Sequence, residues 1–297
     1  MKQIVFIGST ASGKTALALD YANKYGANIL SLDSLAIYRE IDIVSAKPTK
    51  EEMGNIKHFG IDEIYPNEHF DVTLFIDLYI RARDESIKDN RELIIVGGTS
   101  FYLYILINGI SPLPKISSKT KESINEYLED LDEAYSFLYS LDKDYMQNIK
   151  PTDRYRLEKS LEIYLETSLT PTIYFKLNPP KPIIEGSLDI YEIDVDRDIL
   201  RDRIRYRTDN MFKAGLVDEV KYLEDKYTRE PNCMKAIGIR EILSYFDGDF
   251  NLDEAKEKII VNTARLAKRQ RTFNRSKFKN KKSMSIEKIR EELNILY

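Results

Sequence analysis

The sequence is poor in the side chains that build disulfide frameworks and metal centres. Its 297 residues include one cysteine, Cys233, two histidines, His58 and His69, and no tryptophan. A single cysteine excludes an internal disulfide framework and a cysteine-rich zinc site. Two histidines leave little for a His-based metal centre. A disulfide-rich scaffold and a structural zinc domain are therefore excluded.

Long apolar runs are absent as well. Charged residues make up 32% of the chain, and no apolar run approaches the roughly 18 residues that a membrane span requires. The N-terminal MKQIVFIGST has too short an apolar run, and enters a glycine-rich loop too directly, to be a cleaved signal. We therefore expect a soluble, cytoplasmic protein that folds as one large domain or as a domain plus an insertion.

The net charge of −4 hides a strong segregation of charge along the chain. Basic residues gather in the stretch from Ala264 to Lys282, which we call the basic block. Such a block indicates either a solvated helix face followed by a disordered tail or a surface that binds nucleic acid. Between Ala264 and Lys282 there is no acidic residue, but there are many basic ones: Arg265, Lys268, Arg269, Arg271, Arg275, Lys277, Lys279, Lys281 and Lys282.

Three short apolar runs predict buried strands, and each ends in small or polar residues. Residues 3–7 end at Gly8, residues 28–32 at Asp33-Ser34, and residues 92–96 at Gly97-Gly98-Thr99. Helix-like sequence, such as residues 14–25, separates them. We therefore predict an α/β fold, a parallel sheet flanked by helices with its ligands at the carboxyl ends of the strands. A further strand over residues 188–195 resumes the sheet.

The stretch of about residues 114–186 differs in character from the rest. It follows SPLP, contains acidic helix-like sequence such as SINEYLEDLDEAYSFLYSL, and closes in the linker-like LNPPKPIIEG. We interpret it as a helical insertion domain. The α/β core is then residues 1–113 and 187–297, and its last part is a basic helical segment. In the insertion, Tyr127, Tyr135 and Tyr139 stand at helical spacing, which favours packing over ligand contact.

Residues 8–15, GSTASGKT, fit the pattern G-x-x-x-x-G-K-[ST] at every fixed position. The glycines let backbone N–H groups converge on phosphate oxygens, and the following helix presents its positive end. Lys14 supplies a mobile positive charge, and the Thr15 hydroxyl can bind Mg²⁺. We therefore predict a P-loop NTPase-like fold, Mg²⁺ as cofactor, and a phosphate-binding loop made of Gly8, Ser9, Thr10, Ala11, Ser12, Gly13, Lys14 and Thr15.

The end of the strand over residues 92–96 argues against an ordinary ATPase or GTPase. Such enzymes end a strand in an acid that positions Mg²⁺ and the attacking water. Here two glycines and Thr99 stand there, which favours close approach of a ligand to the backbone. The acid stands instead at Asp33, where it could accept a proton from a nucleophile or merely cap the next helix.

A second basic element is LRDRIRYRTDNMFKAGL, which places Arg203 and Arg207 on one helix face and Arg201 and Arg205 on a neighbouring one. Arginines that close over a phosphate-binding loop neutralise charge on a departing phosphate. Ion pairs with the acidic surface would explain most of the four equally well. We expect one of them, not all, to reach the phosphates.

Several separated motifs resemble, in order, those of the tRNA dimethylallyltransferases. They are GSTASGKT, LDSLAIYREIDIVSAKP, VGGTSFYLYILINGISPLP, IKPTDRYRLEKSLEIY, DRDILRDRIRYRTDNMFKAGLVDEV, KAIGIREI and TARLAKRQRTFNR, and they span nearly the whole chain. The resemblance implies transfer of a dimethylallyl group from dimethylallyl diphosphate to N6 of the adenosine 3′ of the tRNA anticodon, at position 37, with release of pyrophosphate. The P-loop would then hold a leaving group, so no water-positioning acid is needed.

The resemblance also assigns roles to single residues. Asp33 aligns with the general base that contacts the adenosine amine, Thr99 with a threonine at the reacting centre, and Arg207 with an arginine that binds the diphosphate. The partners implied are the tRNA anticodon stem-loop and dimethylallyl diphosphate, and we expect a monomer. The implied tRNA contacts, with three residues of the basic block, are Asp33, Ser34, Leu35, Ala36, Thr99, Lys121, Tyr155, Arg156, Leu157, Glu158, Lys159, Lys235, Ala236, Ile237, Gly238, Ile239, Arg240, Lys268, Arg269 and Arg271.

The chain departs from the family pattern in a few places. Ser45 stands where a threonine usually precedes A-K-P, Phe273 replaces a tryptophan, and one histidine in IKHFGIDEI replaces a usual pair. None of these touches the implied chemistry. The zinc finger of the eukaryotic members is missing from this sequence, which therefore resembles the bacterial type.

Three other readings stay open. A small-molecule or nucleoside kinase would suit the P-loop, Asp33 and an arginine lid, but does not need the basic C-terminal block. An adenylate isopentenyltransferase would run the same chemistry on a free nucleotide, but would lack the large insertion. A P-loop binding module without catalysis would leave Asp33 and Arg207 without a purpose.

Overall fold

A parallel sheet organises the larger part of the chain, because short apolar runs pair side by side in one direction. The computed structural model describes residues 1–295. Within them the sheet has six strands in the order β3-β2-β4-β1-β5-β6, all parallel. The strands are β1 (Gln3–Gly8), β2 (Asn28–Ser31), β3 (His58–Phe59), β4 (Leu93–Val96), β5 (Leu188–Ile193) and β6 (Lys282–Met284).

The predicted α/β fold is confirmed, and so are four strands, which correspond to β1, β2, β4 and β5. The prediction missed β3 and β6. These strands have two and three residues, too few to show an alternating pattern in the sequence. They exist because β2 and β5 offer them a partner at the edges of the sheet.

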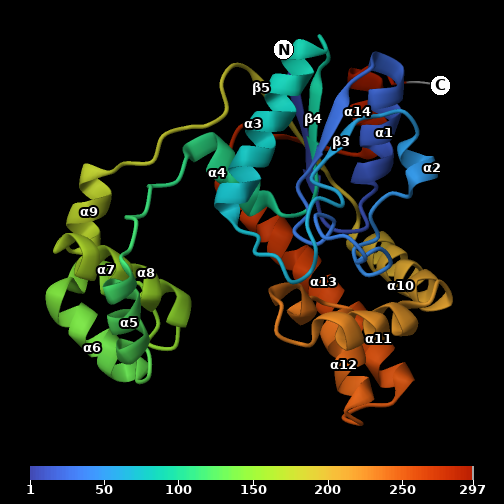
Figure 1. Cartoon of the computed structure of the whole chain (residues 1–297). Coiled ribbons are helices and arrows are strands. Elements are labelled where there is room, and N and C mark those ends of the chain that lie inside the picture. Colours follow the sequence, from blue (N-terminus) through green and yellow to red (C-terminus); the bar gives the residue numbers. More distant parts are fainter. Residues whose placement is uncertain (296–297) are drawn as a thin grey trace. The chain divides into compact units, whose positions relative to one another are not determined.

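Helices cover both faces of the sheet (Figure 1). On one face, α1 (Lys14–Tyr25) and α14 (Ile286–Glu292) share a core with Ile4 and Phe6 of β1. The neighbouring residue Gln3 points to the other face, as alternation along a strand requires. There it accepts a hydrogen bond from Tyr79 of α3 (Val72–Lys88), at 2.8 Å. A short helix, α4 (Ser100–Asn108), follows β4.

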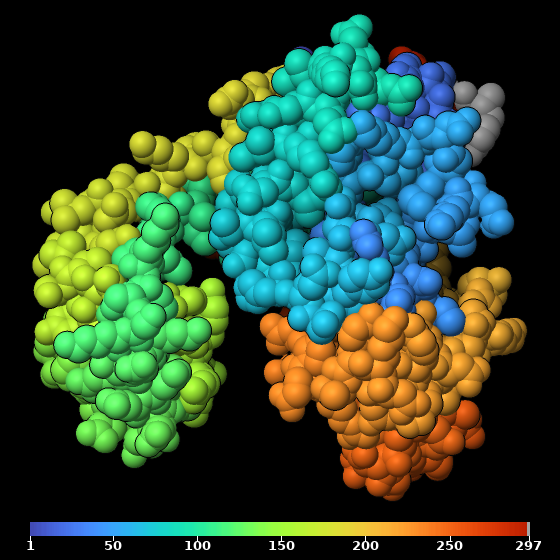
Figure 2. Space-filling model, viewed as in Figure 1, coloured from blue at the N-terminus to red at the C-terminus, as the bar shows by residue number. Residues whose placement is uncertain are grey.

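A group of helices completes this part of the chain. It comprises α10 (Arg197–Lys213), α11 (Leu216–Tyr227), a 3₁₀ turn at Asn232–Lys235, α12 (Ile239–Phe246) and the long α13 (Leu252–Lys277). In the space-filling view the orange surface of this group lies directly against the blue to cyan segment that follows β2 (Figure 2). Lys226 of α11 pairs there with Glu40, at 2.8 Å. The short α2 (Lys50–Met53) belongs to the same segment after β2.

The basic block ends differently from the prediction of a basic helical segment. Its helix, α13, stops at Lys277, and Lys282 begins the edge strand β6, which leads into α14. The alternative of a disordered tail is therefore wrong for residues 278–295. Among the described residues, no helix combines the length and the apolar composition that crossing a membrane requires.

By its internal contacts the chain divides into two units. The first unit consists of residues 1–106 together with the chain from residue 184 on, and the second of residues 107–183, where the sequence suggested 114–186. The second unit is helical, and its helices are α5 (Ser118–Tyr127), α6 (Leu131–Leu141), α7 (Lys143–Met146), α8 (Arg154–Thr167) and α9 (Pro171–Leu177).

The second unit has a hydrophobic core of its own. Ile124, Leu138 and Leu161 are buried in it. Tyr127 stacks on Phe137 with ring centroids 4.9 Å apart. Tyr135 and Tyr139 stack on each other at 5.7 Å. The prediction that these tyrosines serve packing is confirmed.

Candidate active site

The carboxyl ends of β1, β2 and β4 open into one cavity of about 1240 Å³. All of its lining residues belong to the first unit. They come from the P-loop, the segment after β2, the residues after β4, α10, α13, α14 and the turn before α12. This is the edge at which a parallel sheet is expected to bind its ligand.

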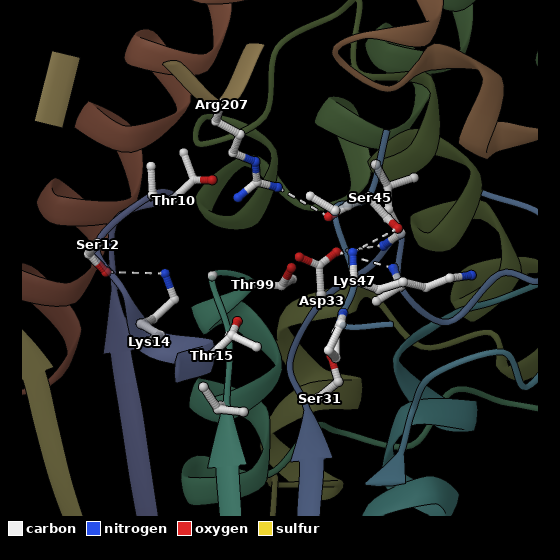
Figure 3. Close-up of a pocket in the computed structure, with 18 of the residues that line it drawn as sticks. Thr10, Ser12, Lys14, Thr15, Ser31, Asp33, Ser45, Lys47, Thr99 and Arg207 are labelled. Atoms are coloured by element: carbon white, nitrogen blue, oxygen red, sulfur yellow. Dashed lines mark hydrogen bonds between the residues drawn. The ribbon is translucent and has the colours of Figure 1, made fainter. Parts of the chain in front are cut away.

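The P-loop presents an open helix start to the cavity. Gly13 adopts φ 96°, a left-handed conformation that favours glycine, and α1 begins without a side-chain cap. Ala11 also has a positive φ, 61°. The first N–H groups of a helix have no partner within it, so an anion is their natural acceptor. Lys14 Nζ donates to the carbonyl of Ser9 at 2.6 Å and points along the loop (Figure 3).

The electrostatics of Lys14 link it to two other predicted site residues. Burial, and after it the nearby charge of Arg207, lower the pKa of its ammonium to about 7, whereas the charge of Asp33 opposes the shift. Burial also lowers the pKa of Arg207, again against the influence of Asp33. Two cations held close together in a poorly solvated place favour binding of a polyanion.

Asp33 and Thr99 meet at the end of β2 and β4, and both point into the cavity (Figure 3). The Thr99 hydroxyl accepts a hydrogen bond from the Ser34 amide at 3.3 Å, and the Thr99 amide donates to Leu32 at 2.9 Å. Gly97 makes this approach possible, because a Cβ there would lie 2.5 Å from the Leu32 carbonyl oxygen. The GGT sequence therefore holds the hydroxyl beside the acid.

The four arginines of α10 divide as the helix faces suggested. Arg203 and Arg207 line the cavity, where Arg203 donates to the Ser12 carbonyl at 3.4 Å and Arg207 to the Ser45 carbonyl at 3.2 Å. Arg201 pairs with Asp198, and Arg205 pairs with Glu257. Two arginines of α10 therefore line the cavity, Arg203 against the P-loop and Arg207 against the segment after β2. That one of them binds the phosphates stays a prediction.

Three residues that shape this site were not predicted from the sequence. Gln270 of α13 binds both the P-loop and the residues after β4. Glu219 of α11 accepts hydrogen bonds from the amides of residues 42–44. Lys47, within the motif A-K-P, is nearly buried and pairs with Asp42 and Asp62. All three lie in motifs quoted for the family resemblance, which was the available signal.

The residues predicted to bind tRNA fall into four places, one of which is the start of α12, with Gly238, Ile239 and Arg240. Asp33, Ser34, Leu35, Ala36, Thr99, Lys235, Ala236 and Ile237 line the cavity, and Lys268, Arg269 and Arg271 lie on α13, where Arg271 pairs with Asp194. Lys121 and residues 155–159 belong to the second unit. The side chains of Leu157 and Ile239 are fully buried, so they support their helices from inside.

A metal site built only from protein ligands is not found among residues 1–295, where no three His, Cys, Asp or Glu side chains gather. The exposed Thr15 and the carboxylate of Asp33 line the same cavity. This donor set fits Mg²⁺ that arrives with a diphosphate, because Mg²⁺ keeps water and phosphate ligands and needs few from the protein.

Comparisons with known proteins agree with this geometry. The model of the IPP transferase family matches residues 36–277. A curated tRNA dimethylallyltransferase from Sulfurovum sp. is 59% identical over 94% of this chain and 93% of its own length. One from Aliarcobacter butzleri is 53% identical over 99% of this chain and 98% of its own length.

Solved structures lead to the same group of proteins. The tRNA isopentenylpyrophosphate transferase of Bacillus halodurans superposes with a TM-score of 0.73 and 29% identity, covering 99% of this chain and 94% of that one. A eukaryotic dimethylallyltransferase acting on tRNA has the same fold, with a TM-score of 0.84 at 24% identity, over 96% of this chain and 74% of that one. With a family match over residues 36–277 and relatives of this identity along nearly its whole length, the chain belongs to the IPP transferase family.

Proposed function

We propose that this protein transfers a dimethylallyl group from dimethylallyl diphosphate to N6 of the adenosine on the 3′ side of the tRNA anticodon, position 37. One observation carries the proposal. The P-loop and the pair Asp33–Thr99 face a single cavity, and β4 ends in glycines and Thr99 rather than in an acid for phosphoryl transfer. The family to which the chain belongs supports the same reaction.

The reaction divides between two sides of the cavity. N6 of the adenosine forms a bond to C1 of the dimethylallyl group while the bond from C1 to oxygen breaks, and the electron pair leaves with pyrophosphate. On one side, Lys14, Arg207 and the amides at the start of α1 stabilise the charge that grows on the leaving group. On the other side, Asp33 accepts the N6 proton, and Thr99 orients the amine.

Thr15 is the residue we propose to hold Mg²⁺ together with the diphosphate. When bound, the ion would neutralise part of the charge of the leaving group.

The tRNA contacts proposed from the family resemblance include residues of both units. In the first unit, Lys235 is exposed and lines the cavity, and Arg240 is exposed at the start of α12. Lys268 and Arg269 are exposed on α13. In the second unit, Tyr155 is 67% exposed, and Lys159 lies over its ring at 5.7 Å. Exposed aromatic and basic side chains of this kind suit unstacked bases and phosphates. We further propose that the enzyme acts as a cytoplasmic monomer.

The reaction is tested with purified protein, Mg²⁺ and radiolabelled dimethylallyl diphosphate. We expect label in an unmodified tRNA that carries adenosine at position 37, and none in the same transcript with guanosine there. ATP-dependent phosphorylation of a nucleoside without prenyl transfer would favour the kinase instead. Labelling of free adenine nucleotides but not of tRNA would favour an adenylate isopentenyltransferase.

A further inference from the structure

Gln270 of α13 connects the two sides of the cavity. Its Oε1 accepts a hydrogen bond from the Thr10 amide of the P-loop at 2.8 Å. Its Nε2 donates to the Gly98 carbonyl, just before Thr99, at 3.0 Å. One side-chain amide therefore bonds at the same time to the loop that holds the leaving group and to the strand end that holds the acceptor.

The Gln270 side chain occupies the space that a side chain at position 98 would need. A Cβ built on Gly98 would lie 2.4 Å from Gln270 Nε2, closer than real Cβ contacts allow. The helix has another bond to the loop, because Ser9 Oγ donates to the Ala267 carbonyl at 3.4 Å. The second glycine of GGT and the glutamine of AKRQ thus form a matched pair, although about 170 residues separate them.

The chemistry explains why such a link matters. The carbon under attack is fixed by the diphosphate, and the attacking nitrogen by Asp33 and Thr99, so the spacing between the two sides sets the geometry of attack. A displacement of about 1 Å can cost on the order of 10²-fold in rate. Hydrogen bonds cross the whole site. Gln270 bonds to Thr10 and to Gly98, and the Ser34 amide bonds to Thr99, the residue after Gly98.

Accepting the proposed function, we infer that Gln270 is a positioning residue, which fixes the distance between the diphosphate-binding loop and the acceptor edge without contacting the reacting atoms. Only a neutral amide suits both bonds. A glutamate could accept from Thr10 but, when ionised, could not donate to Gly98. It would also bring a negative charge to the loop that binds diphosphate. Asparagine is one methylene shorter and cannot span both partners.

The first test compares kinetic constants. Gln270→Leu keeps most of the side-chain volume and removes both bonds. We expect kcat for tRNA prenylation to fall about 10²-fold, with KM for dimethylallyl diphosphate and for tRNA changed less than about threefold. Thr272→Ala is the matched control on the same helix, because its hydroxyl donates to the Lys268 carbonyl within α13, at 3.0 Å. An unchanged kcat in Gln270→Leu, or a loss confined to KM, would overturn the inference.

The second test is a double-mutant cycle between Gly98 and Gln270, which lie in steric contact. It compares changes in kcat, so no single variant has to keep full activity. Gly98→Ala should lower kcat about 10-fold or more in the wild-type background, but less than about threefold in the Gln270→Ala background, where the methyl group has room. Independent, multiplicative effects would rule out the matched pair. A wild-type enzyme that does not prenylate tRNA would contradict the proposed function instead, and thermal unfolding of the same four proteins would still show whether the two positions interact.

Discussion

At the scale of single residues, the structural role of Asp33 can be separated from the chemical role that we propose for it. Its Oδ1 accepts hydrogen bonds from the amides of Leu35 and Ala36, at 2.8 and 3.3 Å, and so holds the turn after β2. The sequence left capping of the next helix as an alternative to catalysis, but Asp33 caps a turn, because residues 34–37 form no helix. An asparagine could make the same two bonds, but it could not take a proton from the substrate amine.

Asp33→Asn is therefore expected to keep the fold and tRNA affinity while kcat falls by at least about 10²-fold, the contribution of a general base. Single-turnover prenylation and filter binding of tRNA measure the two quantities. Asp33→Ala also loses the turn and should lower stability as well. Turnover at the wild-type rate in Asp33→Asn would mean that another group takes the proton.

Lys14 makes the stability of the ligand-free protein depend on pH, because its ammonium group is buried. Its pKa of about 7 in the folded, ligand-free protein lies below the usual 10.5 of an unfolded chain. Between these two values the unfolded chain binds more protons, so this residue makes the stability of the free protein rise with pH in that window. A bound polyanion would favour the charged ammonium and raise its pKa again.

Binding of inorganic pyrophosphate at about pH 8 should therefore be accompanied by proton uptake at Lys14. Calorimetry in buffers of different ionisation enthalpy measures that uptake. Lys14→Arg is the matched control, because an arginine stays charged throughout and the ionisation of pyrophosphate itself is common to both proteins. Equal proton uptake by the two proteins would show that Lys14 is already charged before the anion binds.

At the scale of elements, α11 determines the shape of the loop that receives Arg207. The Glu219 carboxylate accepts hydrogen bonds from the amides of Asp42, Ile43 and Val44, at 2.7 to 2.9 Å. The next residue is Ser45, whose carbonyl accepts from Arg207. A helix outside the sheet thus fixes one wall of the cavity in which we propose that the diphosphate binds.

Glu219→Ala should lower the free energy of unfolding by about 1–3 kcal/mol, because it leaves the half-buried amides of Ile43 and Val44 without their acceptor. Urea denaturation followed by circular dichroism measures the loss. Asp225→Ala on the same helix removes only a surface ion pair with Lys221 and should change stability by less than about 0.5 kcal/mol. Equal losses in the two variants would contradict the anchoring role of Glu219.

At the scale of the whole molecule, the separation of charge matters more than its sum. The net charge is −4, yet Lys268 and Arg269 stand exposed on α13 without an acidic neighbour in that stretch of sequence. Contacts of this kind to a nucleic acid release counterions, and so they weaken as salt rises.

Charge reversal at Lys268 and Arg269 together should weaken tRNA binding at about 50 mM salt, and the difference from the wild type should shrink at about 200 mM. Filter binding at the two concentrations measures it. Affinity for inorganic pyrophosphate should not change, and Lys258→Glu, nearer the start of the same helix, should have a smaller effect on tRNA. A loss that is independent of salt would indicate misfolding rather than a lost phosphate contact.

Much of the fold could be predicted because its signals are local. The strands β1, β2 and β4 are apolar runs closed by glycine or polar residues, and in β5 acidic residues interrupt the apolar ones. The P-loop carries a fixed spacing. The edge strands and the bounds of the second unit carry no such local signal. β6 is three residues within a lysine-rich stretch, and pairing with β5 alone makes it a strand.

The site divides in the same way. The amino-acid sequence alone indicated a phosphate-binding loop, an acid at Asp33, a strand end without an acid, and a basic block. Each of these features depends only on residue type and on short spacings. Only the tertiary structure decided which arginines of α10 face the loop, that Glu219 anchors residues 42–44, and that Gln270 joins Thr10 to Gly98. Such contacts join residues far apart in the chain. They form because α11 lies against residues 42–44 and α13 packs against β1.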